Sequence, residues 1–328
     1  MMIKRSLRGL LAASLLLLPG FSAPAAAEGF PDKPIRLIIP YTPGGSTDLT
    51  GRIYGEALQA ILGQNVIVEN RPGAAGTIGI DAVAKSKPDG YTLGVSGVGP
   101  TAIAPLIDQK TPYQPLRDLD IISGLSIVDL AFVALPNSKY STMKDVLDDA
   151  RANPDKISFA TAGVAGPAHL DVENLSQLAK VKMIHVPFQG DVPAITALLS
   201  GDVTIGAVAA ASATPFLTGG KLKALAAGGP ERLKLLPDLA TAAEQTGFKD
   251  YDAYAWNVLV AARGTPPEVI AKLNKAVNEA AAKPEIKEKL ENLGLKVMPG
   301  DMKWAQEFVA GKIARNKRII ETTGLKRE

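Results

Sequence analysis

Short apolar runs alternate along the chain with segments whose apolar positions recur at helical spacing. The runs that predict strands buried on both faces read IRLII, NVIV, YTLGV, KISFA, KMIHVPF, VTIGAVA, KLKALAA and WNVLVAA. Helical spacing is clearest in LTGRIYGEALQAIL, MKDVLDDARA, AHLDVENLSQLA and VPAITALL. Strands and helices that alternate in this way are typical of α/β proteins with mostly parallel sheets.

The last third of the chain is predicted to be largely helical. A helix should begin at the Pro-Pro pair of PPEVIAKLNK and break at Pro284, and a second helix should run from there to Gly294. A final long helix should cover residues 301–324. The residues of this helix that we expect to face the core are Trp304, Phe308 and Ile319.

The first 27 residues have the pattern of a secretory signal peptide. Basic residues precede the apolar run GLLAASLLLLPG, and Ala25 and Ala27 stand as the small residues before a cleavage point at Glu28. The apolar run is shorter than the about 20 residues that a membrane-spanning helix needs. We therefore expect export to the periplasm, with cleavage after Ala27.

Loss of this leader changes the charge of the protein. The full chain has 36 basic and 33 acidic residues. Because the leader carries three basic and no acidic residues, the remaining 301 residues are balanced at 33 of each. This balance gives no reason to expect nucleic acid or an anionic membrane surface as a partner. The length suffices for two domains of about 150 residues each.

The residues that several kinds of functional site require are missing from this sequence. There is no cysteine, and the only histidines, His169 and His185, have no HExxH-type neighbours, so we expect neither a metal nor a cofactor. The GxxxxGK[ST], GxGxxG and GxSxG motifs are also missing. A 5% aromatic content disfavours a sugar ligand. His169, at a helix start, should pack or cap a turn, and His185 should be a core or edge residue of a strand.

One turn is a candidate binding element. PYTPGGSTDLTGR directly follows the first predicted strand, and its two glycines leave backbone N–H groups open at the start of a helix. We expect Ser46 to cap this helix and Asp48 to lie in its first turn, where Arg52 at i+4 can pair with it. The alternative is a tight turn that binds only water.

Similar turns recur after later strands. The small, mostly Gly-containing segments TAGVAGPAH, QGDVPA and AASATP each follow a predicted strand, and Asp191 is the expected N-cap in the second. Because open α/β sheets bind ligands beyond the carboxyl ends of their strands, these turns can converge on one crevice. Backbone amides in small turns suit a compact carboxylate, held directly or through ordered water.

Five segments closely resemble the substrate-binding proteins of tripartite tricarboxylate transporters, the Bug family. They read FPDKPIRLIIPYTPGGSTDLTGR, GQNVIVENRPGAAGTIGIDAVAKSKPDGYTL, PYQPLRDL, HVPFQGDVPA and AWNVLVAARGTPPEVIAKLN. The resemblance implies an α/β, two-lobed periplasmic-binding-protein fold of type II, in which each lobe is a mostly parallel sheet flanked by helices. It further implies a monomer, not an enzyme, that closes like a flytrap on a small carboxylate and serves the membrane permease subunits of a tripartite transporter.

The resemblance also implies how the chain is divided. Residues 28–128 plus 253–328 would form the first lobe and residues 129–252 the second, with LAFVALPN and AYAWNVLVAA as the hinge. Carried over position by position, the ligand-binding residues would be Tyr41, Thr42, Gly44, Gly45, Ser46, Asp48, Ser96, Thr101, Thr161, Ala162, Gly163, Gly166, His169, Phe188, Gln189, Gly190, Asp191 and Ala209.

Two segments depart from the family pattern. Gly166 and Ala168 stand where the family usually has a serine near Pro167, and Asp191 stands where a small residue is common. If Asp191 points into the crevice, its charge would repel a second carboxylate and attract an ammonium group, which favours amino acids or amide-bearing carboxylates over tricarboxylates. Otherwise Asp191 only caps its helix.

Two rival functions belong to other classes of protein. One is a hydrolase or transferase that uses a serine of these turns, with His169 as the only good candidate for its base. The other is a ligand sensor that docks on a membrane receptor. The sequence leaves the identity of the carboxylate open, because recognition by amides and water leaves few side-chain clues.

Overall fold

The computed structural model describes residues 29–108 and 110–325 of the chain. The predicted leader and its cleavage after Ala27 lie outside the described residues. Within these ranges, every helix is too short or too polar to cross a membrane.

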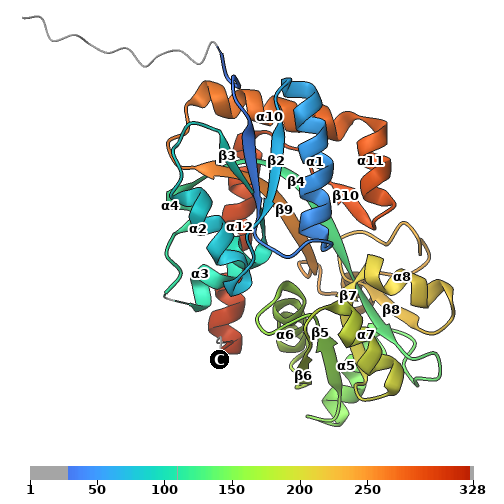
Figure 1. The fold of residues 1–328 in the computed structure, drawn as a ribbon. Coiled ribbons are helices and arrows are strands. Elements are labelled where there is room, and N and C mark those ends of the chain that lie inside the picture. Colours follow the sequence, from blue (N-terminus) through green and yellow to red (C-terminus); the bar gives the residue numbers. More distant parts are fainter. Residues whose placement is uncertain (1–28, 109, 326–328) are drawn as a thin grey trace, which may run out of the picture.

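The amino-terminal part alternates strands and helices, as the hydrophobic pattern predicts (Figure 1). Its elements are β1 (Ile35–Ile39), α1 (Ser46–Leu62), β2 (Val66–Asn70), the 3₁₀ turn η1 (Ala74–Gly76), α2 (Thr77–Ala84), β3 (Thr92–Gly97), the π-helical turn η2 (Gly99–Ile103), α3 (Ala104–Ile107), α4 (Pro115–Asp118) and β4 (Leu119–Ala134).

The same alternation continues through the middle of the chain. Its elements are α5 (Met143–Ala152), β5 (Ser158–Thr161), α6 (Pro167–Ala179), β6 (Ile184–Pro187), α7 (Asp191–Ser200), β7 (Ile205–Ala209), α8 (Ala210–Thr218), β8 (Lys223–Ala227) and α9 (Ala242–Thr246). The last part contains β9 (Tyr254–Ala262), α10 (Pro267–Ala282), α11 (Pro284–Glu291), β10 (Leu295–Val297) and α12 (Met302–Thr323).

Two lobes result, and β4 belongs to both (Figure 1). In the first lobe, parallel strands β2, β1 and β3 are followed by β9 and by residues 119–129 of β4, which pair antiparallel. In the second lobe, residues 130–134 of β4 pair antiparallel with β7 and β8, and β7, β5 and β6 are parallel. Each sheet is therefore mixed: the strands on one side are parallel, and the pairing at β4 is antiparallel, including its pairing with the edge strand β10 in the first lobe and β8 in the second.

Helices cover both faces of each sheet, which gives three layers per lobe. In the first lobe, α1, α10 and α11 bury apolar residues on one face, and α2, η2 and α12 do so on the other. In the second lobe, α5, α6 and α9 cover one face, and α7 and α8 cover the other. The cluster around α12 also takes in Ala165 and Leu170 of the second lobe, so the two lobes share part of a core.

Four details differ from the sequence prediction. Strands β2 and β6 are partly exposed rather than buried on both faces, because each is the edge strand of its sheet. The helix after Pro284 ends at Glu291, and Gly294 (φ 68°) instead turns the chain into β10. Trp304 is 37% exposed and stacks on Phe308 instead of facing the core. No strand was predicted for residues 119–129, which form the first part of β4.

Candidate ligand-binding site

The start of α1 is an uncapped helix end beside the end of β1. Gly45, in extended conformation (φ −79°, ψ 167°), is the N-cap, and Ser46 is the first helical residue rather than the predicted cap. Gly44 has φ 93°, which only glycine adopts easily. A Cβ on either glycine would meet no atom within 4 Å, so the turn is open on its outer side. Thr42 is exposed as well.

Asp48 holds this turn in shape. Its side chain is 2% exposed and accepts hydrogen bonds from the Gly44 amide (2.9 Å), Arg52 Nε (2.9 Å) and Asn70 Nδ2 (2.8 Å). Burial opposes its charge, but the bonds from Arg52, Asn70 and Gly44 outweigh burial and hold the pKa of Asp48 below its usual range. The predicted pair with Arg52 is confirmed, and the Asp48 charge is neutralised inside the first lobe.

A buried polar network ties the first turn of α1 to the crossing strands. Thr47 Oγ1 donates to Asn257 Oδ1 of β9 (2.9 Å), and Asn257 Nδ2 donates to Ser126 Oγ of β4 (3.0 Å). The hydroxyls of Ser126 and Thr50 are 2.9 Å apart. All four side chains are nearly or completely buried. The position of the α1 turn is therefore fixed by the two strands that run toward the second lobe.

The remaining first-lobe candidates are largely internal. Ser96 and Thr101 are fully buried, and their hydroxyl oxygens are 2.5 Å apart, so these side chains bond each other rather than a ligand. Tyr41 packs against the loop before α2, where a Cβ at Gly76 would lie 3.2 Å from its ring. Burial raises the pKa of Tyr41 well above its usual range.

In the second lobe, the turn between β5 and α6 rests on two stacked histidines. His169 is 5% exposed, and its Nδ1 accepts the amide of Ala165 (3.0 Å), which confirms the predicted turn-capping role. The rings of His169 and His185 stack with centroids 3.5 Å apart, and His185 Nε2 lies 2.7 Å from Oγ1 of the buried Thr161. Gly163 (φ 152°) bends the turn, and Gly166 is the N-cap of α6. Ala162 is exposed at the surface of this turn.

The turn before α7 lies beside the turn between β5 and α6, because the Phe188 amide donates to the Thr161 carbonyl (3.0 Å). Gly190 (φ 120°) is the N-cap of α7, and Asp191 is its first helical residue, so the predicted capping role of Asp191 is wrong. Asp191 Oδ2 instead accepts from Ser212 Oγ (3.0 Å), and the Ala209 amide also bonds the carboxylate. Burial raises the pKa of Asp191, although these two bonds oppose the shift.

One of the four predicted turns is not a turn, because AASATP (residues 210–215) forms the start of α8. The helices that follow the other three turns share one feature. Glycine is the N-cap of α1, α6 and α7 (Gly45, Gly166 and Gly190), and glycine has no side chain with which to cap a helix. By contrast, α5, α9 and α12 are capped by the side chains of Thr142, Thr241 and Asp301. Side-chain caps are also missing from α2, α8, α10 and α11, which do not follow the three turns. The first-turn amides of α1, α6 and α7 are therefore left to bond something other than an N-cap side chain.

The predicted site residues divide into two groups. Those that are exposed or partly exposed as whole residues are Tyr41, Thr42, Gly44, Gly45, Ser46, Ala162, Gly163, Gly166, Phe188, Gln189, Gly190, Asp191 and Ala209. Those whose buried side chains bond within the protein are Asp48, Ser96, Thr101, Thr161 and His169. Among the described residues, no three or more His, Asp or Glu side chains lie together as a set of metal ligands.

Two residues that organise the first-lobe turn were missed at the level of sequence. Asn257 interrupts the apolar strand WNVLVAA, and Asn70 ends β2 and donates to the Tyr41 carbonyl (3.0 Å) as well as to Asp48. A polar amide inside an apolar strand signals a buried hydrogen-bond partner. That partner lies 210 residues away in the case of Thr47 and Asn257, which no local pattern identifies.

Comparison with known proteins agrees with this geometry. The family model described as "Tripartite tricarboxylate transporter family receptor" matches residues 51–325. Protein BugT of Bordetella pertussis is 33% identical over 308 residues, which cover 94% of each chain. The structure of the periplasmic binding protein BugD is similar with a TM-score of 0.75 and 29% identity, over 91% of this chain and 100% of that one. MatC of Rhodopseudomonas palustris with bound malate has a TM-score of 0.75 and 30% identity, over 89% of this chain and 100% of MatC.

Proposed function

The chain belongs to the tripartite tricarboxylate transporter receptor family, and we propose that it captures one small carboxylate between its lobes in the periplasm and delivers it to a membrane permease. An organic acid, an aromatic carboxylate or an amino acid would fit this description. The malate bound to the similar MatC supports a carboxylate of this size.

The observation that carries the proposal is the set of glycine N-caps on α1, α6 and α7. A helix start without a side-chain cap offers N–H groups and the positive end of the helix dipole to an anion. The predicted site contains no lysine or arginine, so amides and water must supply the attraction for a carboxylate. This donor set recognises the charge and size of the ligand more strongly than the rest of its structure.

We propose further that binding is accompanied by closure of two lobes, residues 28–128 plus 253–328 and residues 129–252. The change of sheet partners by β4 between Asp129 and Leu130 supports a hinge at the first boundary. A ligand that contacts both lobes favours the closed state, because only that state provides both sets of contacts.

We propose no catalytic role for the turns. A general base has to reach a nucleophile that is open to substrate. His169 is buried with its Nδ1 bonded to the Ala165 amide, and the hydroxyl near His185 belongs to the fully buried Thr161. These contacts support a structural role for both histidines.

A thermal-shift panel tests the binding proposal. The panel contains malate, succinate, adipate, benzoate, glutamate, glutamine and citrate, together with succinamide as an uncharged control. A ligand at 100 times its Kd should stabilise the native state by about 2.7 kcal/mol. We expect at least one carboxylate to raise Tm and succinamide to leave it unchanged. A protein that responds to no carboxylate, or equally to succinamide, would contradict the proposal.

Delivery to a permease requires a separate measurement, because a receptor-bound sensor would retain the same ligand. Uptake of the radiolabelled ligand by proteoliposomes that contain the permease subunits should require the loaded protein. Uptake that proceeds equally without the protein would exclude delivery while leaving ligand binding intact.

A further inference from the structure

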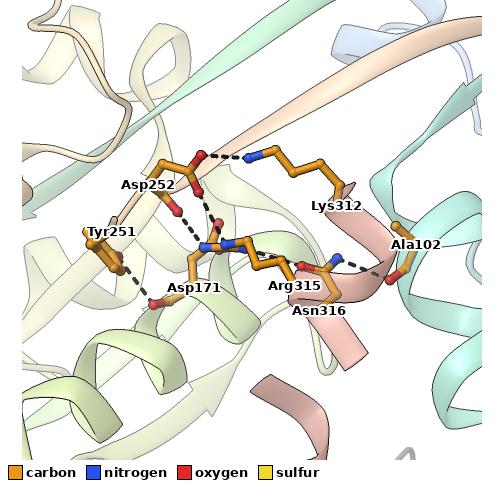
Figure 2. Close-up of polar contacts among 7 residues, drawn as sticks. All are labelled: Ala102, Asp171, Tyr251, Asp252, Lys312, Arg315 and Asn316. Carbon is orange, nitrogen blue, oxygen red and sulfur yellow. Dashed lines mark hydrogen bonds and ion pairs between the residues drawn. The ribbon is translucent and has the colours of Figure 1, made fainter. Parts of the chain in front are cut away.

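A network of charged side chains joins α12 of the first lobe to α6 of the second lobe (Figure 2). Arg315 Nη2 lies 2.9 Å from Asp171 Oδ1 and also donates to the Asp252 carbonyl (2.5 Å). Arg315 Nε is 3.2 Å from Asp252 Oδ1, and Lys312 Nζ is 2.6 Å from Asp252 Oδ2. One guanidinium therefore bonds the carboxylate of Asp171 and both the carboxylate and the carbonyl of Asp252, which lie in two separate segments of the chain.

The network is largely shielded from water. The side chains of Asp171 and Arg315 are 5% and 17% exposed. Tyr251, also buried, donates its hydroxyl to the backbone carbonyl of Asp171 (3.2 Å). Because buried charged and hydrogen-bonding groups are costly when they lose their partners, these groups strongly favour the arrangement in which α6 and α12 stay together.

Both ends of the network adjoin predicted ligand turns. Asp171 lies about one helical turn after Pro167, where α6 leaves the turn of residues 161–166. On the other side, Asn316 accepts from Arg315 Nη1 (3.2 Å) and donates to the Ala102 carbonyl in η2 (3.0 Å). Ala102 follows the predicted site residue Thr101. The network thus connects the predicted ligand-binding turn of residues 161–166 in the second lobe with the predicted ligand-binding segment around Thr101 in the first lobe.

The network also lies beside the place where the chain returns to the first lobe. Asp252 stands two residues before β9, which pairs only with first-lobe strand segments along its length. Atoms close to a hinge move least when one lobe rotates against the other. Contacts at this place can therefore persist while the turns farther from it separate.

We propose that Arg315 is a positioning residue, which holds α6 to α12 as a pivot about which the two lobes open and close. The inference rests on the proposed lobe closure, but it concerns the protein without ligand as well. The planar guanidinium is required because it bonds acceptors in several directions at once, whereas an ammonium on a flexible stem does not fix their geometry.

Spin-label distance measurements on the ligand-free protein test the pivot. The chain has no cysteine, so Lys87→Cys in the first lobe and Lys156→Cys in the second, both exposed, introduce the only two labels. Arg315→Met and Arg315→Lys are compared in this background. Lys317→Met is the matched control, since Lys317 lies on the same helix and pairs only with exposed Glu321 of α12 at 3.9 Å.

We expect Arg315→Met to broaden the distance distribution about twofold and to speed hydrogen exchange in α6 about tenfold or more, with no change in the control. Arg315→Lys should lie between the wild type and Arg315→Met. If the Met variant does not fold, the Lys variant decides by the same two readouts. Wild-type distances and exchange in a folded Arg315 variant would overturn the proposal. Since no ligand is added, this result is independent of whether the protein binds a carboxylate.

Discussion

Replacement of Gly45 by serine should give the helix α1 a side-chain cap and thereby compete with the ligand. Gly45 already has the extended conformation of an N-cap residue, and its Cβ position is open. A serine hydroxyl at this position accepts a hydrogen bond from the backbone N–H of the second or third helical residue. We propose that these same backbone N–H groups donate hydrogen bonds to the carboxylate of the ligand.

The expected magnitudes follow from the two hydrogen bonds in competition. Serine is slightly better than glycine as an N-cap, so Gly45→Ser should leave the free energy of unfolding unchanged or raise it by about a few tenths of a kcal/mol. A hydrogen bond to a charged group contributes about 1.5–3 kcal/mol. Losing one such bond should raise the Kd of the ligand roughly 10- to 150-fold.

Gly45→Ala is the matched control, because alanine adds a Cβ but no hydroxyl. Alanine is a poor N-cap, so this variant should unfold about 0.5–1 kcal/mol more easily and yet bind the ligand nearly as tightly as the wild type. Urea unfolding gives the stabilities, and calorimetry with the best carboxylate of the panel gives the affinities. If serine leaves the affinity unchanged, or alanine lowers it as much as serine does, the proposed use of the α1 amides is wrong.

Three further substitutions test other parts of the site. Gly44→Ala should cost about 1–2 kcal/mol of stability, because an L-residue is strained at φ 93°, and an unchanged urea midpoint would refute this. Asn257→Leu should cost about 1–3 kcal/mol by leaving the Thr47 hydroxyl without its buried acceptor and removing one of the two partners of the Ser126 hydroxyl, and a stability equal to that of the wild type would show that the network is dispensable. Asp191→Ser should move citrate and other multivalent carboxylates up the thermal-shift ranking relative to amino acids, whereas an unaltered ranking would mean that Asp191 only holds Ser212.

Most strands, including the central β9, were predictable, because their apolar runs are short and are separated by turns. The first part of β4 was not, since Ser123, Gly124, Ser126 and Asp129 break its apolar pattern. Each of these four residues contacts an element that is distant in the sequence, and this contact explains the residue type better than its sequence neighbours do. Gly124 has no room for a side chain, because a Cβ would lie 2.1 Å from the Met298 carbonyl, and Ser126 bonds Asn257. Tertiary contacts of this kind override local propensity.

The turns of the candidate site were predictable in place but not in detail. Gly-rich sequence after a strand located the starts of α1, α6 and α7, whereas the Gly-free AASATP was taken for a turn although it lies inside α8. Ser46 and Asp191 were each assigned as N-caps one residue too late. The prediction followed the general preference for serine and aspartate at this position. In the structure, Gly45 and Gly190 take the N-cap position instead. Local rules are expected to fail where function requires an open helix end.

Asp171, which is buried, and His185, which is partly buried, give stability opposite dependences on pH. Burial raises the pKa of Asp171 to about 7, although Arg315 opposes the shift. The native state therefore binds this proton more tightly than the unfolded chain does, and the associated stability is complete below about pH 3.9 and lost as pH rises through 7.

Burial, assisted by the neighbouring His169, lowers the pKa of His185 to about 4, so its contribution to stability is complete above about pH 6.5 and lost as pH falls to 4. The two slopes oppose each other between these limits. Relative to the wild type, Asp171→Asn should remove a downward contribution to the urea midpoint between about pH 4 and 7, and His185→Gln should reduce the loss between pH 6.5 and 4. If both variants follow the wild-type pH profile in parallel, these two groups do not govern it.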